Sequence, residues 1–123
     1  MPDYDGQQFD PPAPVARVIV RTPDHARTVP DVTMLIDSGA DVTLIPQVCA
    51  ERLGLVSNME TGLLVRGFDG SPIMADVVEA EIVFLGRNFR GRFLLVTGEC
   101  GILGRNVLNN LALLFDGPRR NWR

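Results

Sequence analysis

Residues 35–45, with the sequence LIDSGADVTLI, place one carboxylate, that of Asp37, between two apolar runs. A carboxylate next to apolar residues is partly removed from water, which is costly unless hydrogen bonds satisfy it. Ser38 offers a hydroxyl, and Gly39 lets the chain turn tightly so that its N–H can point at the carboxylate. The stretch predicts a rigid loop between two strands that presents Asp37, although Asp-Ser-Gly alone is also an ordinary turn.

The segments around this loop have the composition of short strands. Residues 15–22 alternate and are rich in β-branched side chains, and Pro46–Leu53 has the start and stop signals of a helix that closes at Gly54. Further apolar or alternating runs lie at 32–37, 42–45, 63–66, 73–78, 81–85 and 89–96, with turns expected at Pro23-Asp24, Pro30-Asp31, Gly67, Gly70, Gly86 and Gly91, and a second helix at Arg105–Leu113 after Gly104. This pattern predicts a mainly β fold, a closed or nearly closed antiparallel β-barrel with one or two short helices.

The composition fits one domain. The chain has 123 residues, 46% of them hydrophobic, and a net charge of −3 from 12 Arg, no Lys and 15 acidic residues. We expect a Pro-rich N-terminal arm at 1–14, a domain at 15–115 and a C-terminal tail at 116–123 that is solvated or involved in dimer contacts. The arm lacks the features of a secretory signal and no run is apolar enough for a membrane span, so we expect a soluble, cytoplasmic protein.

A second segment, taken together with the Asp37 loop, makes the pattern more specific. Residues 100–108, CGILGRNVL, are an apolar-apolar-Gly segment that leads into a helix. LIDSGAD and ILGRN, in this order and at this separation, resemble the retropepsin-like aspartic proteases, the single-domain homodimeric class typified by retroviral proteases. The resemblance covers about residues 15–115. It implies an acid-protease barrel in which the second segment threads through the first loop, and peptide hydrolysis without cofactor or metal.

The resemblance also implies a role for each matching residue. Asp37 would be the catalytic carboxylate, and the Ser38 hydroxyl would bond across to the partner's loop. Asp41 and Arg105 would form an acid–Arg pair that braces the loop against the helix, and residues 67–71 would form the flap tip. The loop would be supported by Ser38, Gly39 and Arg105, and substrate would be bound by Gly39, Ala40, Asp41, Gly67, Phe68, Asp69 and Gly70. The tip reads Gly-Phe-Asp-Gly, unlike the Gly-rich apolar tip of retroviral enzymes.

One Asp-Ser-Gly per chain has a consequence for assembly. The chemistry of the family uses two carboxylates that share one proton, and this chain has no second Asp-(Ser/Thr)-Gly. An active enzyme therefore requires a homodimer with Asp37 of each chain at the twofold axis. The resemblance implies an extended peptide as its substrate. Retroviral dimers interleave both termini; the arm and the tail leave open whether this chain does so.

Other interpretations remain. Asp37 could be a structural acid, and the chain a catalytically inactive retropepsin-fold domain for dimerisation or peptide binding. Arg residues that alternate with aromatics at 87–93 could suggest a nucleic-acid surface, but at strand spacing they are more simply a solvated face, and the negative net charge disfavours it. His25 is expected in a solvated turn and Cys49 in the core, and Cys100 is expected in a packing position, with a place near the dimer axis as the alternative. A thiol nucleophile is disfavoured because the single His has no evident route to either thiol.

Overall fold

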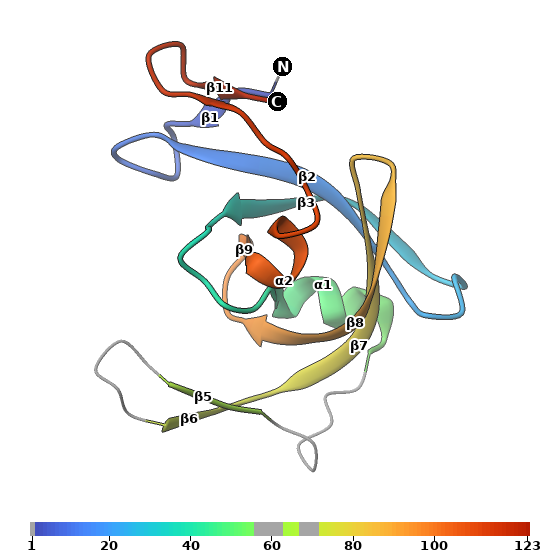
Figure 1. The fold of residues 1–123 in the computed structure, drawn as a ribbon. Helices are drawn as coiled ribbons and strands as arrows, with labels where there is room; N and C mark the ends of the chain where they lie inside the picture. The colour runs from blue at the N-terminus through green and yellow to red at the C-terminus, as the bar shows by residue number, and fades with distance from the viewer. Residues whose placement is uncertain (1, 56–62, 67–71) are drawn as a thin grey trace.

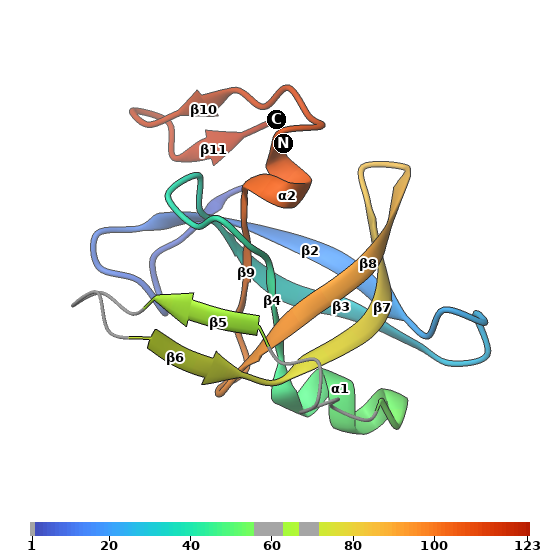
Figure 2. The ribbon, with the colours of Figure 1, turned by 60° about the horizontal axis from the view of Figure 1, so that its bottom comes forward.

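A computed structural model describes residues 2–55, 63–66 and 72–123. The strands are β1 (Tyr4–Asp5), β2 (Ala13–Arg21), β3 (Thr28–Ile36), β4 (Leu44–Pro46), β5 (Leu63–Arg66), β6 (Pro72–Ala75), β7 (Val77–Phe84), β8 (Arg87–Val96), β9 (Gly101–Leu103), β10 (Phe115–Asp116) and β11 (Asn121–Trp122), and the helices are α1 (Gln47–Leu53) and α2 (Arg105–Leu108). Figures 1 and 2 together show α1 and α2 on opposite sides of the main strands, with the β5–β6 ribbon to one side. No helix in these described ranges is long and apolar enough to cross a membrane.

The main sheet closes on itself. Its strands follow the order β1-β2-β3-β9-β4-β8-β7, and β2 also pairs with β7 at Ile19↔Val83, which closes a barrel from β2 to β7. The predicted β-barrel is therefore confirmed. Most pairs are antiparallel, but β3–β9 and β4–β8 are parallel. β9 lies between β3 and β4, parallel to β3 and antiparallel to β4, although it follows β8 in the sequence.

The core lies inside this barrel. Alternation along β2 buries Ala16, Val18 and Val20 and leaves Arg17 and Ile19 exposed, as a half-buried strand requires. The buried core also includes side chains from β3, β4, β7, β8, β9, β11 and both helices. Its large, fully buried members include Met34, Ile45, Ile82, Leu103, Val107 and Trp122. The closed barrel thus supplies a rigid frame for the loop after β3.

Two of the predicted turns are wrong. Pro30 and Asp31 lie inside β3, where the register with β2 shifts between Val18 and Val20, so the pair forms a bulge instead of ending the strand. Asp31 takes a positive φ of 56°, a conformation that Asp tolerates better than most residues. Gly91 lies in the middle of β8, paired with Ala80, because unbroken pairing with β7 outweighs the weak strand propensity of glycine.

The first helix ends where the sequence predicts, and the second ends earlier. Gly54 ends α1 in the left-handed conformation, with its N–H on the Glu51 carbonyl at 3.0 Å, as its sequence signal indicates. The second helix is shorter than the expected 105–113 and ends at Leu108. The Asn110 side chain donates to the carbonyls of Asn106 and Val107 at 3.1 and 3.3 Å, which satisfies the end of the helix early.

The two termini lie side by side at one end of the barrel (Figure 2). β1 pairs with β2, and β10 and β11 form a hairpin. Trp122 is not solvated: it is 2% exposed, its ring centroid lies 5.9 Å from that of Phe84, and its Nε1 donates to the Val15 carbonyl at 2.8 Å. The C-terminal tail is thereby packed onto its own barrel.

Candidate active site

Hydrogen bonds from backbone N–H groups position Asp37 in the loop after β3. The Asp37 N–H donates to the Leu103 carbonyl at 3.1 Å, which continues the parallel pairing of β3 with β9. The Gly39 N–H donates to Asp37 Oδ1 at 2.9 Å, and the Ala40 N–H donates to the Asp37 carbonyl at 3.1 Å. These three bonds fix both the main chain and one carboxylate oxygen, while the side of the chain that carries Ser38 and Gly39 stays exposed.

The close approach of the second motif depends on Gly104. A Cβ built on Gly104 would lie 2.3 Å from the Val42 carbonyl oxygen and 3.0 Å from that of Ala40. Both are backbone atoms of the Asp37 loop, so they cannot move aside as a flexible side chain could. The apolar-apolar-Gly pattern therefore has a steric reason: only glycine lets the end of β9 pass beside this loop.

A buried hydroxyl joins the two motifs. Thr43 is 0% exposed, its Oγ1 accepts a bond from the Gly104 N–H at 3.0 Å, and it donates to Asn106 Oδ1 at 2.6 Å. The sequence analysis did not single out Thr43 or Asn106. The signal that could have found them is a polar residue between the apolar neighbours Val42 and Leu44, because a buried hydroxyl needs a partner.

Arg105 holds the outer side of the same loop. Its backbone N–H donates to the Ala40 carbonyl at 2.8 Å, and its Nη1 donates to the Ser38 carbonyl at 2.9 Å. Its Nη2 also forms an ion pair with the Asp41 carboxylate. Since Asp41 is 80% exposed, the pair itself contributes little to stability, and the bonds to the two carbonyls position the loop.

The structure brings together most of the residues that the motif analysis named. Asp37 is partly exposed, Ser38, Gly39 and Asp41 are exposed, and Arg105 contacts two of the loop carbonyls. Strands β5 and β6 pair with each other from Leu63↔Ala75 to Arg66↔Pro72. The expected flap tip between them, Gly67, Phe68, Asp69 and Gly70, lies outside the described residues. The described part of the chain contains no group of three His, Cys, Asp or Glu residues that could hold a metal ion.

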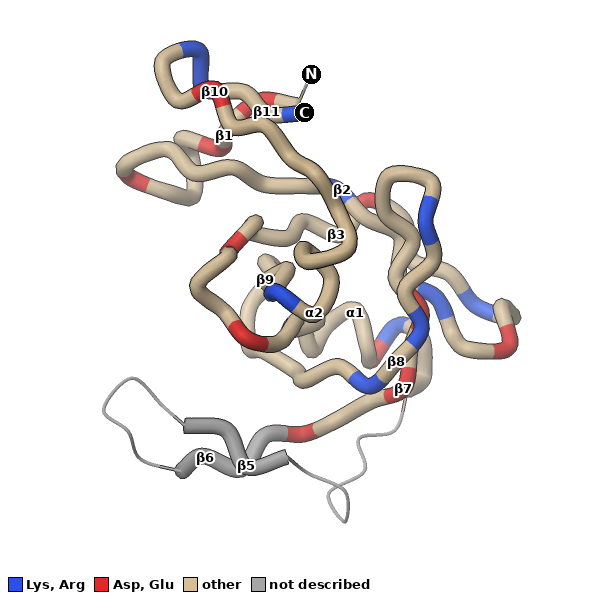
Figure 3. The backbone as a smooth tube through the Cα atoms, viewed as in Figure 1, with Lys and Arg blue, Asp and Glu red and all other residues tan. Residues whose placement is uncertain are grey.

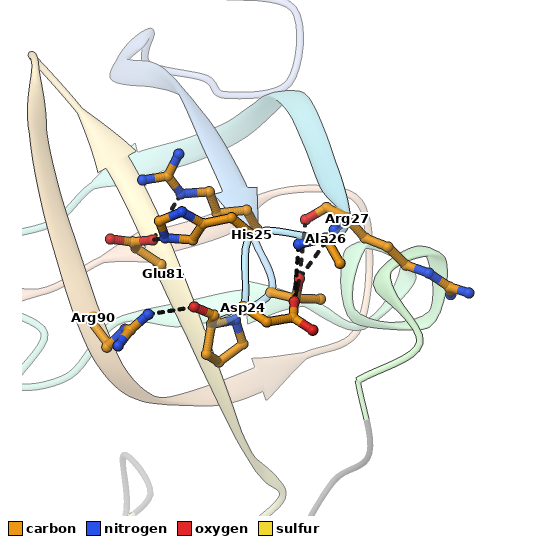
Figure 4. Close-up of polar contacts among 9 residues, drawn as sticks. Asp24, His25, Ala26, Arg27, Glu81 and Arg90 are labelled. Atoms are coloured by element: carbon orange, nitrogen blue, oxygen red, sulfur yellow. Dashed lines mark hydrogen bonds and ion pairs between the residues drawn. The ribbon is translucent and has the colours of Figure 1, made fainter.

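A second polar cluster lies away from the loop (Figure 4). Glu81 on β7 is 5% exposed, accepts a bond from Arg21 Nε at 2.8 Å and also contacts His25 Nε2. The hydrogen bond from Arg21 holds the pKa of the Glu81 carboxyl below its usual range. His25 is exposed, as expected of a turn residue, but the contact ties the β2–β3 turn to the barrel wall.

The two thiols lie in protected positions. Cys49 on α1 is 4% exposed, and burial raises the pKa of its thiol to about 11. Burial also raises the pKa of Cys100, which is half-buried. A high pKa keeps a thiol protonated and therefore a poor nucleophile, so the acidic loop is the better candidate for chemistry.

Comparisons with known proteins agree with this geometry. The structure is similar to that of the EIAV protease solved with the inhibitor HBY-793, with a TM-score of 0.59 and 20% identity over 86% of this chain and 91% of that one. A search of curated protein sequences gives no match. The family model of the gag-polyprotein putative aspartyl protease matches residues 28–110, well over half of the chain and both motifs. The chain therefore belongs to the gag-polyprotein aspartyl protease family and has the retropepsin-like fold.

Proposed function

We propose that this protein is an aspartic endopeptidase, active as a homodimer, with Asp37 of each copy as the catalytic pair. The observation that supports the proposal is the way in which hydrogen bonds position Asp37. Its main chain is fixed by Leu103 and one carboxylate oxygen by the Gly39 N–H, while the residue stays partly open to solvent. A carboxylate with a purely structural role would have both oxygens bound by protein donors, because burial without such bonds is costly.

The chemistry follows from two such carboxylates at a twofold axis. Two carboxylates that face one another closely share one proton, because both cannot ionise easily. The ionised group takes a proton from a water that attacks the scissile carbonyl, and the protonated group polarises that carbonyl. The roles then reverse, and the leaving amine receives a proton. Such a pair works best in mildly acidic solution.

The substrate proposed here is a peptide in extended conformation. Gly39, Ala40 and Asp41 follow Asp37 in the loop, and Gly39 and Asp41 are exposed. The Gly39 N–H and both backbone groups of Ala40 are already bonded within the chain, so an extended peptide would exchange main-chain hydrogen bonds with the Gly39 carbonyl and the Asp41 backbone, which flank Ala40. Arg105 holds the carbonyls of Ser38 and Ala40 in place, so this binding edge is already organised. Organisation before binding lowers the entropy that substrate binding has to offset.

The charge pattern supports a peptide over a nucleic acid. Arg residues and acidic residues are intermixed along β7 and β8 (Figure 3), where Arg90 lies opposite Glu81 and Arg92 opposite Glu79. Phosphate binding requires a concentration of positive charge on one face. The Arg residues of β8 therefore read as the solvated face of a strand with charged cross-strand neighbours.

The test is digestion of a peptide library in mildly acidic solution. The parent should cleave, and the Asp37→Asn variant should lose cleavage while it keeps its fold and its dimer. Asp31→Asn is the matched control, because it makes the same change at an exposed residue whose positive φ suits Asn, and it should cleave like the parent. Equal cleavage by Asp37→Asn and the parent would refute the proposal. A parent that binds peptides without cleaving them would indicate the inactive peptide-binding alternative.

A further inference from the structure

An apolar groove opens directly beside the Asp37 loop. Its volume is about 410 Å³, and Ile36 and Ser38 line it on the loop side. Leu108, Leu111, Leu113 and Phe115 line it on the side of α2 and the C-terminal hairpin. Phe115 is 45% exposed and its neighbour Leu114 is 53% exposed. Leu114 does not line the groove, but the exposed Phe115 does, and an apolar groove with an exposed aromatic side chain marks an interaction surface.

The strand that borders this groove has one open edge. Leu114 and Arg123 exchange both backbone hydrogen bonds, from the Leu114 N–H at 2.6 Å and from the Arg123 N–H at 2.9 Å. In an antiparallel ladder the next residue points its N–H and C=O the other way, so those of Phe115 face away from β11. Within the described ranges β10 pairs with β11 alone, and this outer edge is open. Figure 2 shows β10 outermost, with β11 between it and the body.

The N-terminal arm is already engaged within its own chain. Tyr4 pairs with Pro14 of β2, and its N–H donates to the Arg120 carbonyl at 2.8 Å. The Trp122 N–H donates to the Pro2 carbonyl at 3.0 Å, so β11 is bonded on both edges, by β10 and by the arm. The arm therefore has few free backbone groups to offer to a partner, and β11 lies between the arm and β10.

We propose that the outer edge of β10 pairs with β10 of a second copy of this chain, with Phe115 opposite Phe115 at the twofold axis. The two hairpins then form one four-stranded antiparallel sheet, β11-β10-β10-β11, without exchange of termini. Pairing a strand with its own copy closes the assembly and removes an exposed edge. The proposal rests on the proposed function, because Asp37 needs a second copy, and Ser38 and Phe115 border the same groove.

Cross-linking tests the position of the axis. Phe115→Cys should form a disulfide-linked dimer on mild oxidation, because residues that exchange both bonds lie about 5.5 Å apart at Cα, within disulfide reach. Val48→Cys is the matched control: Val48 is 41% exposed on α1, remote from the hairpin in Figure 2, and should not cross-link. The parent, which retains Cys49 and Cys100, should not cross-link either.

A backbone variant tests the edge itself. Phe115→Pro removes an N–H that the hairpin does not use, and proline is tolerated on edge strands. Sedimentation should show a monomer where the parent is a dimer, with an unchanged circular dichroism spectrum and with peptide cleavage reduced at least tenfold. A folded, dimeric Pro variant, or a Phe115→Cys protein that fails to cross-link, would overturn the proposed interface even if the parent cleaves peptides. A monomeric parent would overturn it as well.

The two proposals fail in different ways. A parent that dimerises through Phe115 but cleaves nothing would leave this interface standing and refute the protease function. If deletion of residues 1–5 abolishes the dimer while Phe115→Pro keeps it, the copies exchange their arms, and the hairpin interface is wrong.

Discussion

Replacing Thr43 by valine isolates the bond that joins the two motifs. The side chain is 0% exposed, and its hydroxyl takes the Gly104 N–H at 3.0 Å and donates to Asn106 at 2.6 Å. Valine keeps the shape of threonine and removes only the hydroxyl. The buried Gly104 N–H is then left without an acceptor, which costs about 1–3 kcal/mol. Asn106 is exposed, so its amide can turn to water.

The expected loss is therefore about 2 kcal/mol in the free energy of unfolding. For a domain of this size that corresponds to a fall in Tm of roughly 6–10 °C. Thr43→Ser is the control, because it keeps both hydrogen bonds and loses one methyl group, at a cost of about 1 kcal/mol.

Denaturant unfolding of the three proteins gives the comparison. An account based on packing alone expects valine to be tolerated better than serine, since it fills the same volume. Our reasoning expects the opposite order. If Thr43→Val proves as stable as the parent, or more stable than Thr43→Ser, the hydroxyl does not join the motifs in the way described.

Three further outcomes follow from the geometry. Gly104→Ala should lower stability by about 1–3 kcal/mol or more through overlap with the Val42 carbonyl, whereas Gly117→Ala, with nothing within 4 Å, should unfold like the parent. Trp122→Phe should lose about 1–3 kcal/mol in denaturant unfolding by leaving the Val15 carbonyl without its donor; an unchanged midpoint would contradict this. Glu81→Gln should be less stable than the parent above pH 4.5, the ordinary value for Glu, and the difference should vanish as the pH falls through the lowered pKa of Glu81. A difference in thermal stability that grows on acidification would contradict the assigned ion pair.

The Asp37 loop, the glycine motif and the β class of the fold could be read from the sequence, because each has a local cause. Alternation along a strand shows which face is buried, as at residues 15–22. The pattern of acid, small hydroxyl and glycine marks a tight loop wherever it stands in the chain. The end of α1 at Gly54 was equally local, since glycine suits the left-handed cap.

The features that escaped sequence reasoning join residues far apart in the chain. Thr43 meets Asn106 across 63 positions, and Trp122 meets the Val15 carbonyl across 107. Glu81 looks like a solvated strand residue until closure of the barrel places Arg21 beside it. Such contacts depend on which strands become neighbours and in which register. Side-chain chemistry along the chain determined the loop that carries Asp37, and the tertiary structure alone decided what braces that loop and which strand edge was left open, because strand register is set by the whole barrel.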